Sequence, residues 1–394
     1  MVSSRFRIGL RDHYQQTAFW IIASDGTGRY HRFDRGFLMA KGKSKSASSN
    51  PTMKDVAKLA GVSQSTVSRV LNDSQVAFPI SDETRQKIME AVETLGYHPN
   101  MIARSLRTQR TGMIAVMIGD ISNAFYHPIV RAVQDIAGSR DYDVLISNSD
   151  HVYENERRFL DSVLRRPVDG VIMAPHRFST DDLDGFIMRS RIPIVALGAQ
   201  VKHPLVDVVG GTSEPATCEA ITWLIREQGH QRIGFMGVAG DMPPGPARLR
   251  GYERAMHDAG LPIEPGFIQK VEFTMEGGHV AMYAFLQMEK PPTAIFACNS
   301  LMAIGAMVVA QAQGFDVPQD FSVMGFDDIP EATIVHPALT IVARDLPGIG
   351  RQVAEILFER IDGRVNGAGR FFQTQWQLTE RQSVRRFAAD DHTG

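Results

Sequence analysis

Short runs of hydrophobic residues recur through the second part of the chain, and amphipathic segments of helical length separate them. The runs lie at 113–118, 143–148, 170–175, 193–198, 232–238, 294–299 and 322–327. Strands that alternate with helices in this way are typical of βαβ units and parallel sheets. These strands are more numerous than one doubly wound sheet usually carries. The pattern therefore predicts an α/β body with two lobes, in which ligands bind at the carboxyl ends of the strands.

A helical pattern of apolar positions occupies 51–98. Thr52 can cap a first helix that ends at Gly61, with an acidic residue three positions after the cap to complete a capping box. Ser63 can cap a second helix, and a third runs from Ser81 to Gly96 with acidic residues in its first turn. Three short helices in this range predict a small bundle.

The composition is that of an ordinary globular protein, but the charge is unevenly distributed. The 394 residues are 43% hydrophobic and 22% charged. Residues 41–110 hold eleven Lys and Arg against six Asp and Glu, a net of +5, whereas residues 111–394 hold twenty-five against thirty-five, a net of −10. A basic head on an acidic body indicates that only the head meets a polyanion.

Several classes of function find no support in the sequence. Cys218 and Cys298 have no metal-ligand spacing, so neither a disulfide framework nor a metal site is predicted, and a reducing cytoplasm is expected. The apolar run Ala18–Ala23 is too short for a signal core or a membrane span. The glycines of Gly234–Gly240 lack the dinucleotide-binding spacing, and no catalytic motif is present. We expect neither an enzyme nor a cofactor.

The second helix of the head carries the candidate chemistry for DNA. Val67, Val70 and Leu71 share one face, which leaves Gln64, Ser65, Ser68, Arg69 and Asn72 on the opposite face. Arg side chains hydrogen-bond well to guanine, Gln side chains to adenine, and Ser hydroxyls to either donors or acceptors, so this face could contact base edges. An ordinary solvated helix face is the alternative, and the helix alone leaves both open.

A family resemblance distinguishes these alternatives. The segment TMKDVAKLAGVSQSTVSRVLN, followed in order by T-R, L-G-Y and P-N, resembles the helix-turn-helix of the lactose/purine repressor (LacI) family. The segment Tyr97–Leu106 resembles the hinge of that family, and the likeness continues to about Ser383. The resemblance implies an α/β protein: an N-terminal three-helix helix-turn-helix head, a hinge helix, and a periplasmic-binding-protein-like core of two doubly wound lobes.

The resemblance also implies which residues meet DNA. Gln64, Ser65 and Arg69 would read the major groove, and Leu106 would wedge into the minor groove and kink the duplex. A hinge helix this short is marginal in isolation, so it would order only with a dimer partner and DNA. The alternative for Leu106 is a linker residue packed on the body. The expected DNA-binding residues are Thr52, Gln64, Ser65, Thr66, Ser68, Arg69, Asn72, Tyr97, Asn100, Ala103, Arg104 and Leu106.

Seven residues are expected to bind a small effector between the lobes. Arg248 matches the family's arginine in an R-x-x-G-aromatic motif, and Phe273 matches an aromatic that packs on the ligand ring. The others follow predicted strands, and the full set is Asp120, Phe125, Tyr126, Arg248, Phe273, Asn299 and Asp327. Each has a structural alternative: a helix cap for the two aspartates, core packing for the phenylalanines, and a surface ion pair for the arginine.

Three departures from the family pattern leave the ligand open. Ser300 follows Asn299 where many members have Asp, Gly198 stands where many have an acidic residue, and Ala124 replaces a frequent proline. The missing carboxylate at position 198 removes a common acceptor for sugar hydroxyls. His127, His176 and Arg177 lie near strand ends and are candidates to replace the missing carboxylate as ligand-binding groups. Because these side chains can be cationic, the effector could be an anion such as a sugar acid or sugar phosphate.

The expected organisation is an extension or disordered segment at 1–50, a DNA-binding domain at 51–98, a hinge at 99–111, an effector-binding and dimerisation domain at 112–387 and a tail at 388–394. The N-lobe would comprise about 112–211 and 344–371, and the C-lobe about 212–342 and 372–387. The predicted function is a repressor that binds a palindromic, double-stranded operator as a homodimer and is switched by a sugar or sugar derivative. The alternative is a solute-binding protein of the same two-lobed fold with no regulatory role. The presence of the helix-turn-helix head argues against this alternative.

Overall fold

The computed structural model describes residues 51–71, 80–98, 105, 109–198 and 200–387. The chain divides into two compact units, one ending at His98 and one beginning at Pro99, and each is described by itself. The predicted hinge lies outside the described residues except for residue 105 and residues 109–111. The predictions for Asn72, Asn100, Ala103, Arg104 and Leu106 fall outside them as well.

The head is the predicted three-helix bundle, with α1 at Met53–Ala60, α2 at Gln64–Leu71 and α3 at Asp82–Leu95. Thr52 caps α1 in a full capping box with Asp55, whose pKa is lowered by the hydrogen bonds from Thr52. Gly61 ends α1 with a φ of +67°, a conformation that suits glycine. The core of the bundle consists of Val56, Ala57, Val67, Val70, Ile88, Ala91 and Tyr97.

The body contains two six-stranded sheets. The first has the order β11-β5-β4-β3-β1-β2 and is parallel throughout; the second has the order β12-β10-β9-β8-β6-β7, with only β12 antiparallel to its neighbour. We call the units built on them the N-lobe and the C-lobe. The strands are β1 Met113–Ile118, β2 Asp143–Asn148, β3 Gly170–Met173, β4 Ile194–Leu197, β5 Asp207–Gly210, β6 Ile233–Val238, β7 Ile268–Val271, β8 Ala294–Ala297, β9 Ser322–Phe326, β10 Thr340–Ala343, β11 Phe371–Gln373 and β12 Gln377–Thr379. All seven predicted strands are confirmed, whereas β5, β7, β10, β11 and β12 were not anticipated.

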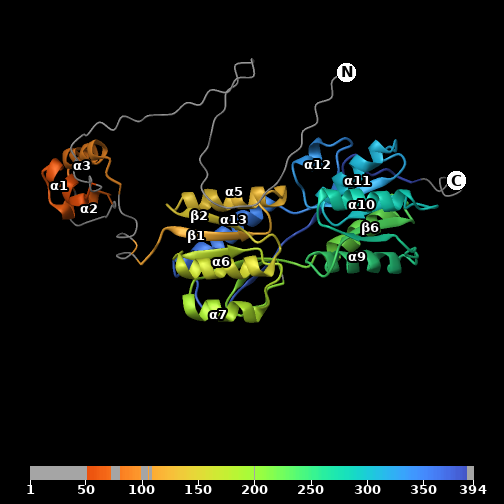
Figure 1. Ribbon diagram of the computed structural model, residues 1–394, viewed down its shortest axis with the longest axis horizontal. Helices are drawn as coiled ribbons and strands as arrows, with labels where there is room; N and C mark the ends of the chain where they lie inside the picture. Colours follow the sequence, from red (N-terminus) through yellow and green to blue (C-terminus); the bar gives the residue numbers. More distant parts are fainter. Residues whose placement is uncertain (1–50, 72–79, 99–104, 106–108, 199, 388–394) are drawn as a thin grey trace, which may run out of the picture. The chain divides into compact units, whose positions relative to one another are not determined.

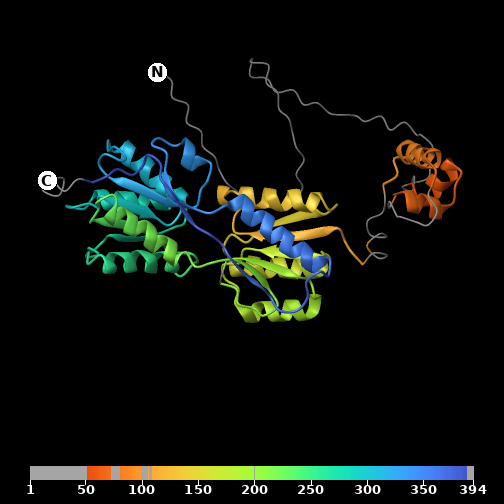
Figure 2. The same cartoon turned by 180° about the vertical axis from the view of Figure 1, so that it is seen from behind.

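Helices cover both faces of the N-lobe sheet (Figures 1 and 2). On one face lie α5 (His127–Gly138) and α13 (Leu346–Ile361); on the other lie α6 (Tyr153–Arg165) and α7 (Thr180–Ser190). Along β1, alternate side chains enter the two resulting cores: Val116 packs with α5 and α13, and Met117 packs with α6 and α7. Burial on both faces is the reason why this strand reads as a continuous apolar run.

The C-lobe has the same layered construction. Helices α8 (Glu214–Arg226) and α9 (Gly245–Asp258) pack together, as do α10 (Met275–Leu286) and α11 (Ser300–Ala312). Figure 1 shows α9 on one side of β6 and α10 and α11 on the other. The short helices are α12 (Glu331–Ile334) and the 3-10 turn η1 (Ala124–Tyr126).

The chain passes between the two lobes three times. It leaves the N-lobe after β5, returns between β10 and α13, and leaves again between β11 and β12. Because all three connections lie beyond strand ends, they lie beside the site that parallel sheets offer to a ligand.

Candidate functional site

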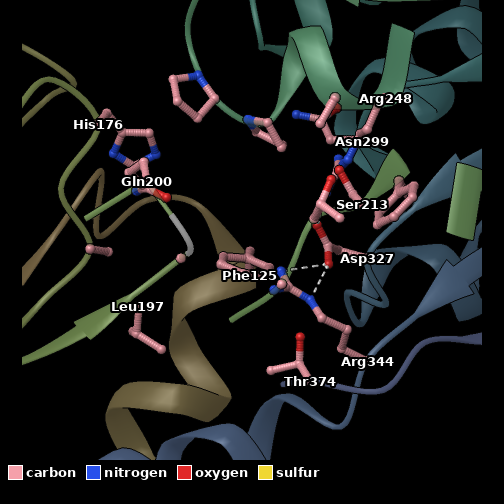
Figure 3. A pocket seen from close by; sticks show the side chains of 18 of the residues that line it. Phe125, His176, Leu197, Gln200, Ser213, Arg248, Asn299, Asp327, Arg344 and Thr374 are labelled. Carbon is pink, nitrogen blue, oxygen red and sulfur yellow. Dashed lines mark hydrogen bonds and ion pairs between the residues drawn. The ribbon is translucent and has the colours of Figure 1, made fainter. Parts of the chain in front are cut away.

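A cavity of about 670 Å³ is lined by both lobes and by the connections between them. Its size is within the range of about 300–1,000 Å³ that small-molecule sites usually have. Figure 3 shows His176, Gln200 and Leu197 on one side and Arg248, Asn299 and Asp327 on the other. The six predicted effector residues that line it are Phe125, Tyr126, Arg248, Phe273, Asn299 and Asp327.

The carboxylate of Asp327 lies between two guanidinium groups. Oδ2 accepts a hydrogen bond from Nη2 of Arg248 at 3.1 Å, and Oδ1 accepts from Nη2 and Nε of Arg344 at 3.0 and 3.2 Å. Asp327 is only 7% exposed and has a φ of +68°, which Asp tolerates better than most residues. Its oxygens are therefore already engaged, whereas the sequence led us to expect them to face the ligand.

Arg248 is the more buried of the two arginines, at 1% exposed. It projects from α9, donates to the carbonyl of Cys298, and lies 3.5 Å from the ring centroid of Phe326. Burial lowers the pKa of Arg248, which the Asp327 carboxylate opposes. The surface ion pair that the sequence left open for Arg248 is wrong, because the pair is buried.

Arg344 belongs to the site although the sequence reasoning did not single it out. It lies on the connection between β10 and α13, with its guanidinium 4.2 Å from the ring centroid of Trp376 and 5.1 Å from that of Phe125. Cation–π contacts of this kind attract a guanidinium to the faces of the rings. Arg344 thus links a C-lobe carboxylate to an N-lobe aromatic ring.

Aromatic and amide groups complete the walls. Phe125 and Tyr126 form an edge-to-face pair at 5.0 Å, and Asn123 caps their turn through its side-chain oxygen. Burial raises the pKa of Tyr126. Asn299 caps α11 by accepting from the Met302 amide at 2.7 Å, and its own amide nitrogen donates to the Phe273 carbonyl at 3.2 Å.

Asp120 is the predicted effector residue that does not line the cavity. Its two carboxylate oxygens accept from the amide and hydroxyl of Ser122, which lower its pKa. Asp120 therefore stabilises a turn, and the helix cap that the sequence left open for it is supplied by Asn123 instead.

The departures at positions 198 and 300 have local explanations. Gly198 has a φ of +97°, and a Cβ there would collide with the side-chain amide of Gln200, so Gln200 occupies the space beside it. The Ser300 hydroxyl is buried and donates to the backbone carbonyls of Phe326 and Asp327. Ser300 therefore fixes the loop that presents the Asp327 side chain.

Two histidines line the N-lobe side of the cavity. The rings of His151 and His176 meet edge to face at 4.2 Å, and each has a buried Nδ1 without a hydrogen-bond partner among the described residues. Burial lowers the pKa of both and brings that of His176 to about 3, so both imidazoles are neutral near pH 7. Of the three candidates to compensate for position 198, His176 lines the cavity, whereas His127 and Arg177 do not.

In the head, α2 presents several of the predicted DNA-contacting groups. Gln64, Ser65 and Arg69 are exposed, while Thr66 and Ser68 are half-buried. The hydroxyls of Ser65 and Thr66 hydrogen-bond to that of Ser63 at the start of the helix, at 2.7 and 2.8 Å. Exposed Thr52 serves as the cap of α1.

Tyr97 belongs to the core of the head. It is 7% exposed and packs with the apolar residues of the bundle. Its side chain therefore has a structural role that the resemblance did not indicate. In the part of the chain that the structure describes, no helix has both the length and the hydropathy that a membrane span requires.

The fold and the cavity define a class of protein: a helix-turn-helix head on a body of two ligand-binding lobes. Residues 52–100 match the model of the lacI family of bacterial regulatory proteins, and residues 224–384 match the periplasmic binding protein-like domain. The chain belongs to the lacI family and is a transcriptional regulator, not an enzyme.

Two relatives show how far the similarity extends. Catabolite control protein A of Priestia megaterium is 34% identical over 309 residues, which cover 78% of this chain and 92% of that protein. The transcriptional repressor CytR of Escherichia coli K12 is 32% identical over 334 residues, or 83% and 94% of the two chains.

Solved structures have the same architecture. A complex of the transcriptional regulator CelR with cellobiose is 30% identical, with a TM-score of 0.62 over 84% of this chain and 99% of that chain. The lac repressor dimer bound to operator and the anti-inducer ONPF has a TM-score of 0.73 at 24% identity, covering 86% and 100%. At that identity the likeness concerns the fold alone.

Proposed function

We propose that the protein is an effector-responsive repressor, in which a sugar or sugar derivative bound in the cavity changes the affinity of the head for operator DNA. The observation that carries this proposal is the cavity of about 670 Å³, which both lobes and their connections line. A ligand in contact with both lobes favours one lobe arrangement over another, and only such a difference can shift a conformational equilibrium. The sugar in the CelR complex supports a ligand of this class.

The head provides the DNA-binding surface of this proposal. Exposed Gln64, Ser65 and Arg69 on α2 would contact base edges in the major groove, with a homodimer on a palindromic operator. The relative CytR, which is 32% identical, is a helix-turn-helix transcriptional repressor, and this supports a DNA-binding role for the head. Leu106, which lies outside the described residues, would be the minor-groove wedge of the hinge.

Helix α13 offers a physical connection from the cavity to the hinge. It begins two residues after Arg344, which contacts Asp327 and Phe125. At its other end, Arg110 donates to the Ile361 carbonyl at 2.9 Å and binds the Asp362 carboxylate at 3.1 Å. Movement of α13 would thereby reach the segment that leads to the head, and a coupling of about 1–3 kcal/mol gives ordinary regulation.

Selection of binding sequences from a random DNA pool, followed by titration of the selected duplex by fluorescence anisotropy, tests the function. A panel of sugars, sugar acids and sugar phosphates is then added to the complex. We expect at least one ligand to change operator affinity about 5- to 150-fold, by release for an inducer or by tightening for a corepressor. A body that binds a sugar while the head selects no duplex would instead favour the solute-binding alternative.

A further inference from the structure

The charges that line the cavity are unequal in sign. Among the described lining residues, Lys202, Arg248, Arg250 and Arg344 are cationic, and Asp327 is the single carboxylate. Arg250 is compensated outside the cavity by Glu214, whose Oε2 lies 2.9 Å from its Nε. Lys202 is exposed at the rim. The excess of positive charge therefore comes chiefly from Arg248 and Arg344, and Lys202 adds to it.

Asp327 cannot neutralise both arginines. Its two oxygens accept three hydrogen bonds from Arg248 and Arg344, so one negative charge stands between two positive charges. The group has a net positive charge in a place where little water screens it, because Arg344 and Asp327 have side chains only 15% and 10% exposed. Burial makes an uncompensated charge costly, and an anion from the ligand would remove this cost.

Buried polar atoms without partners indicate where the ligand would bind. Ten such side-chain atoms occur in the described part of the chain, and five of them belong to residues that line this cavity. They are Oγ of Ser213, Oγ1 of Thr374, Nε of Arg248 and Nδ1 of both His151 and His176. Buried polar groups are normally hydrogen-bonded, so this concentration marks the cavity as a site for a polar molecule.

The cavity also has apolar walls that fit the carbon face of a sugar ring. Phe125, Phe273, Leu197 and Trp376 line it, from the N-lobe, the C-lobe and a connection. Hydroxyl groups of a ligand can donate hydrogen bonds to, or accept them from, the hydroxyls of Ser213 and Thr374. They can do the same with the neutral imidazoles of His151 and His176. The only carboxylate in the lining, however, is already occupied by the arginines.

We infer that the effector is an anionic sugar derivative, whose carboxylate or phosphoryl group lies near Arg344 and whose hydroxyls bind the polar atoms of the lining that lack partners. This inference rests on the proposed function in taking the cavity as the effector site. Arg344 suits the role because its guanidinium carries donors in a planar fork, which matches carboxylate and phosphate oxygens. The guanidinium is held in place by Trp376 and Asp327.

Matched ligands test the sign of the charge on the effector. Isothermal titration of the full chain would compare glucose, galactose and mannose with their aldonic acids, their uronic acids and their 6-phosphates. At least one charged member should bind ten times more tightly than its neutral parent, and its affinity should fall as salt rises. The acids and the phosphates form separate arms, so the tighter arm identifies the anionic group. A neutral sugar that binds as tightly as its charged counterparts, or no binding by any charged member, overturns the inference.

Substitution of Arg344 tests the position of the anion. Arg344→Gln should reduce affinity for the charged ligand at least tenfold and change affinity for the neutral parent little, while Arg344→Lys should retain part of the preference. Arg254→Gln is the matched control, since Arg254 lies on α9 and does not line the cavity. If Arg344→Gln does not fold, exposed Lys202→Gln replaces it, with an expected loss of about threefold that high salt abolishes. A preference unchanged in these variants contradicts the assignment.

Operator titration in parallel separates this inference from the proposed function. A neutral sugar that changes operator affinity supports the function and overturns the anionic ligand. A charged sugar that binds the cavity without changing operator affinity supports the ligand class and contradicts the switch.

Discussion

Arg344 binds the carboxylate of Asp327 through two of its nitrogen atoms, at 3.0 and 3.2 Å. Asp327 follows the last residue of β9 in the C-lobe, and Arg344 lies on the connection that returns to the N-lobe. The pair therefore fixes one crossing of the chain to the end of a C-lobe strand, at the wall of the cavity. Any ligand that changes the charge beside this pair also acts on the contact between the lobes.

Asp327→Asn should destabilise the body by about 3 kcal/mol, because it leaves two buried guanidinium groups without their counter-ion. Asn tolerates the positive φ of this position, so the loss reports charge and not backbone strain. Urea denaturation measures it, with exposed Asp258→Asn as the control. Equal stabilities of the two variants would show that the arginine pair does not depend on Asp327.

Arg248→Ala should abolish the response to the effector, because this side chain lines the cavity and holds the Asp327 carboxylate. For an inducer, operator affinity without ligand should be spared. For a corepressor, the variant should remain in the weakly binding state. Operator titration with and without ligand distinguishes these cases, and Arg254→Ala on the same helix is the control. A full ligand response in Arg248→Ala would place the effector site elsewhere.

Gln64→Ala and Arg69→Ala should each weaken specific operator binding by about 1–3 kcal/mol and relax the sequence preference. Both residues are exposed on α2, and their side chains have the donors that base edges accept. Competition between the selected operator and random duplex measures the effect, with exposed Gln86→Ala on α3 as the control. An equal loss for both duplexes would instead identify phosphate contacts.

His176 should make the stability of the body depend on pH below neutrality. Its pKa falls from the ordinary value of about 6.5 to about 3 on folding, chiefly because of burial. The neutral form is favoured in the folded state, so its contribution is present above pH 6.5 and is lost as pH falls from 6.5 towards 3. The slope is at most about 1.4 kcal/mol per pH unit.

Urea denaturation of the wild type and His176→Gln between pH 7 and pH 4.5 measures this contribution. The wild type should lose more stability than the variant over this interval, because both proteins carry His151 and only the wild type carries His176 as well. His257→Gln serves as the control because its side chain is 89% exposed. Parallel stability curves for the wild type and His176→Gln would contradict the lowered pKa.

Arg110→Gln should reduce the change in operator affinity that the effector produces, while ligand binding to the body stays the same. Arg110 joins the start of the body to the Ile361 carbonyl and the Asp362 carboxylate, at the end of α13. Arg140→Gln is the control, because Arg140 binds the same carboxylate from elsewhere in the N-lobe. Equal coupling in the two variants would exclude this route from the cavity to the hinge.

The head was predictable because its signals are local. Thr52 and Ser81 cap the helices that they precede, and Gly61 and Gly96 end helices with positive φ. Apolar residues at helical spacing then define one buried face. Most of the predicted strands were recognisable for a related reason, since burial on both faces makes a central strand such as β1 or β3 a continuous apolar run.

Other strands carried no such pattern. β7 has the sequence IQKV and lies at the edge of its sheet, where its residues stay half-buried or exposed. β11 and β12 have three residues each, and they form strands because β5 and β10 lie beside them. A pairing partner distant in sequence decides such elements, so local periodicity cannot reveal them.

The sequence by itself determined the family, the three-helix head, the two-lobed α/β body and six of the residues that line the cavity. Only the tertiary structure brought Arg344, Thr374 and Trp376 to that cavity, because three separate crossings of the chain meet there. It also changed the interpretation of Asp327, whose oxygens two arginines occupy. The net charge of a site depends on distances between residues far apart in sequence, and those distances are fixed only when the sheets and their connections pack together.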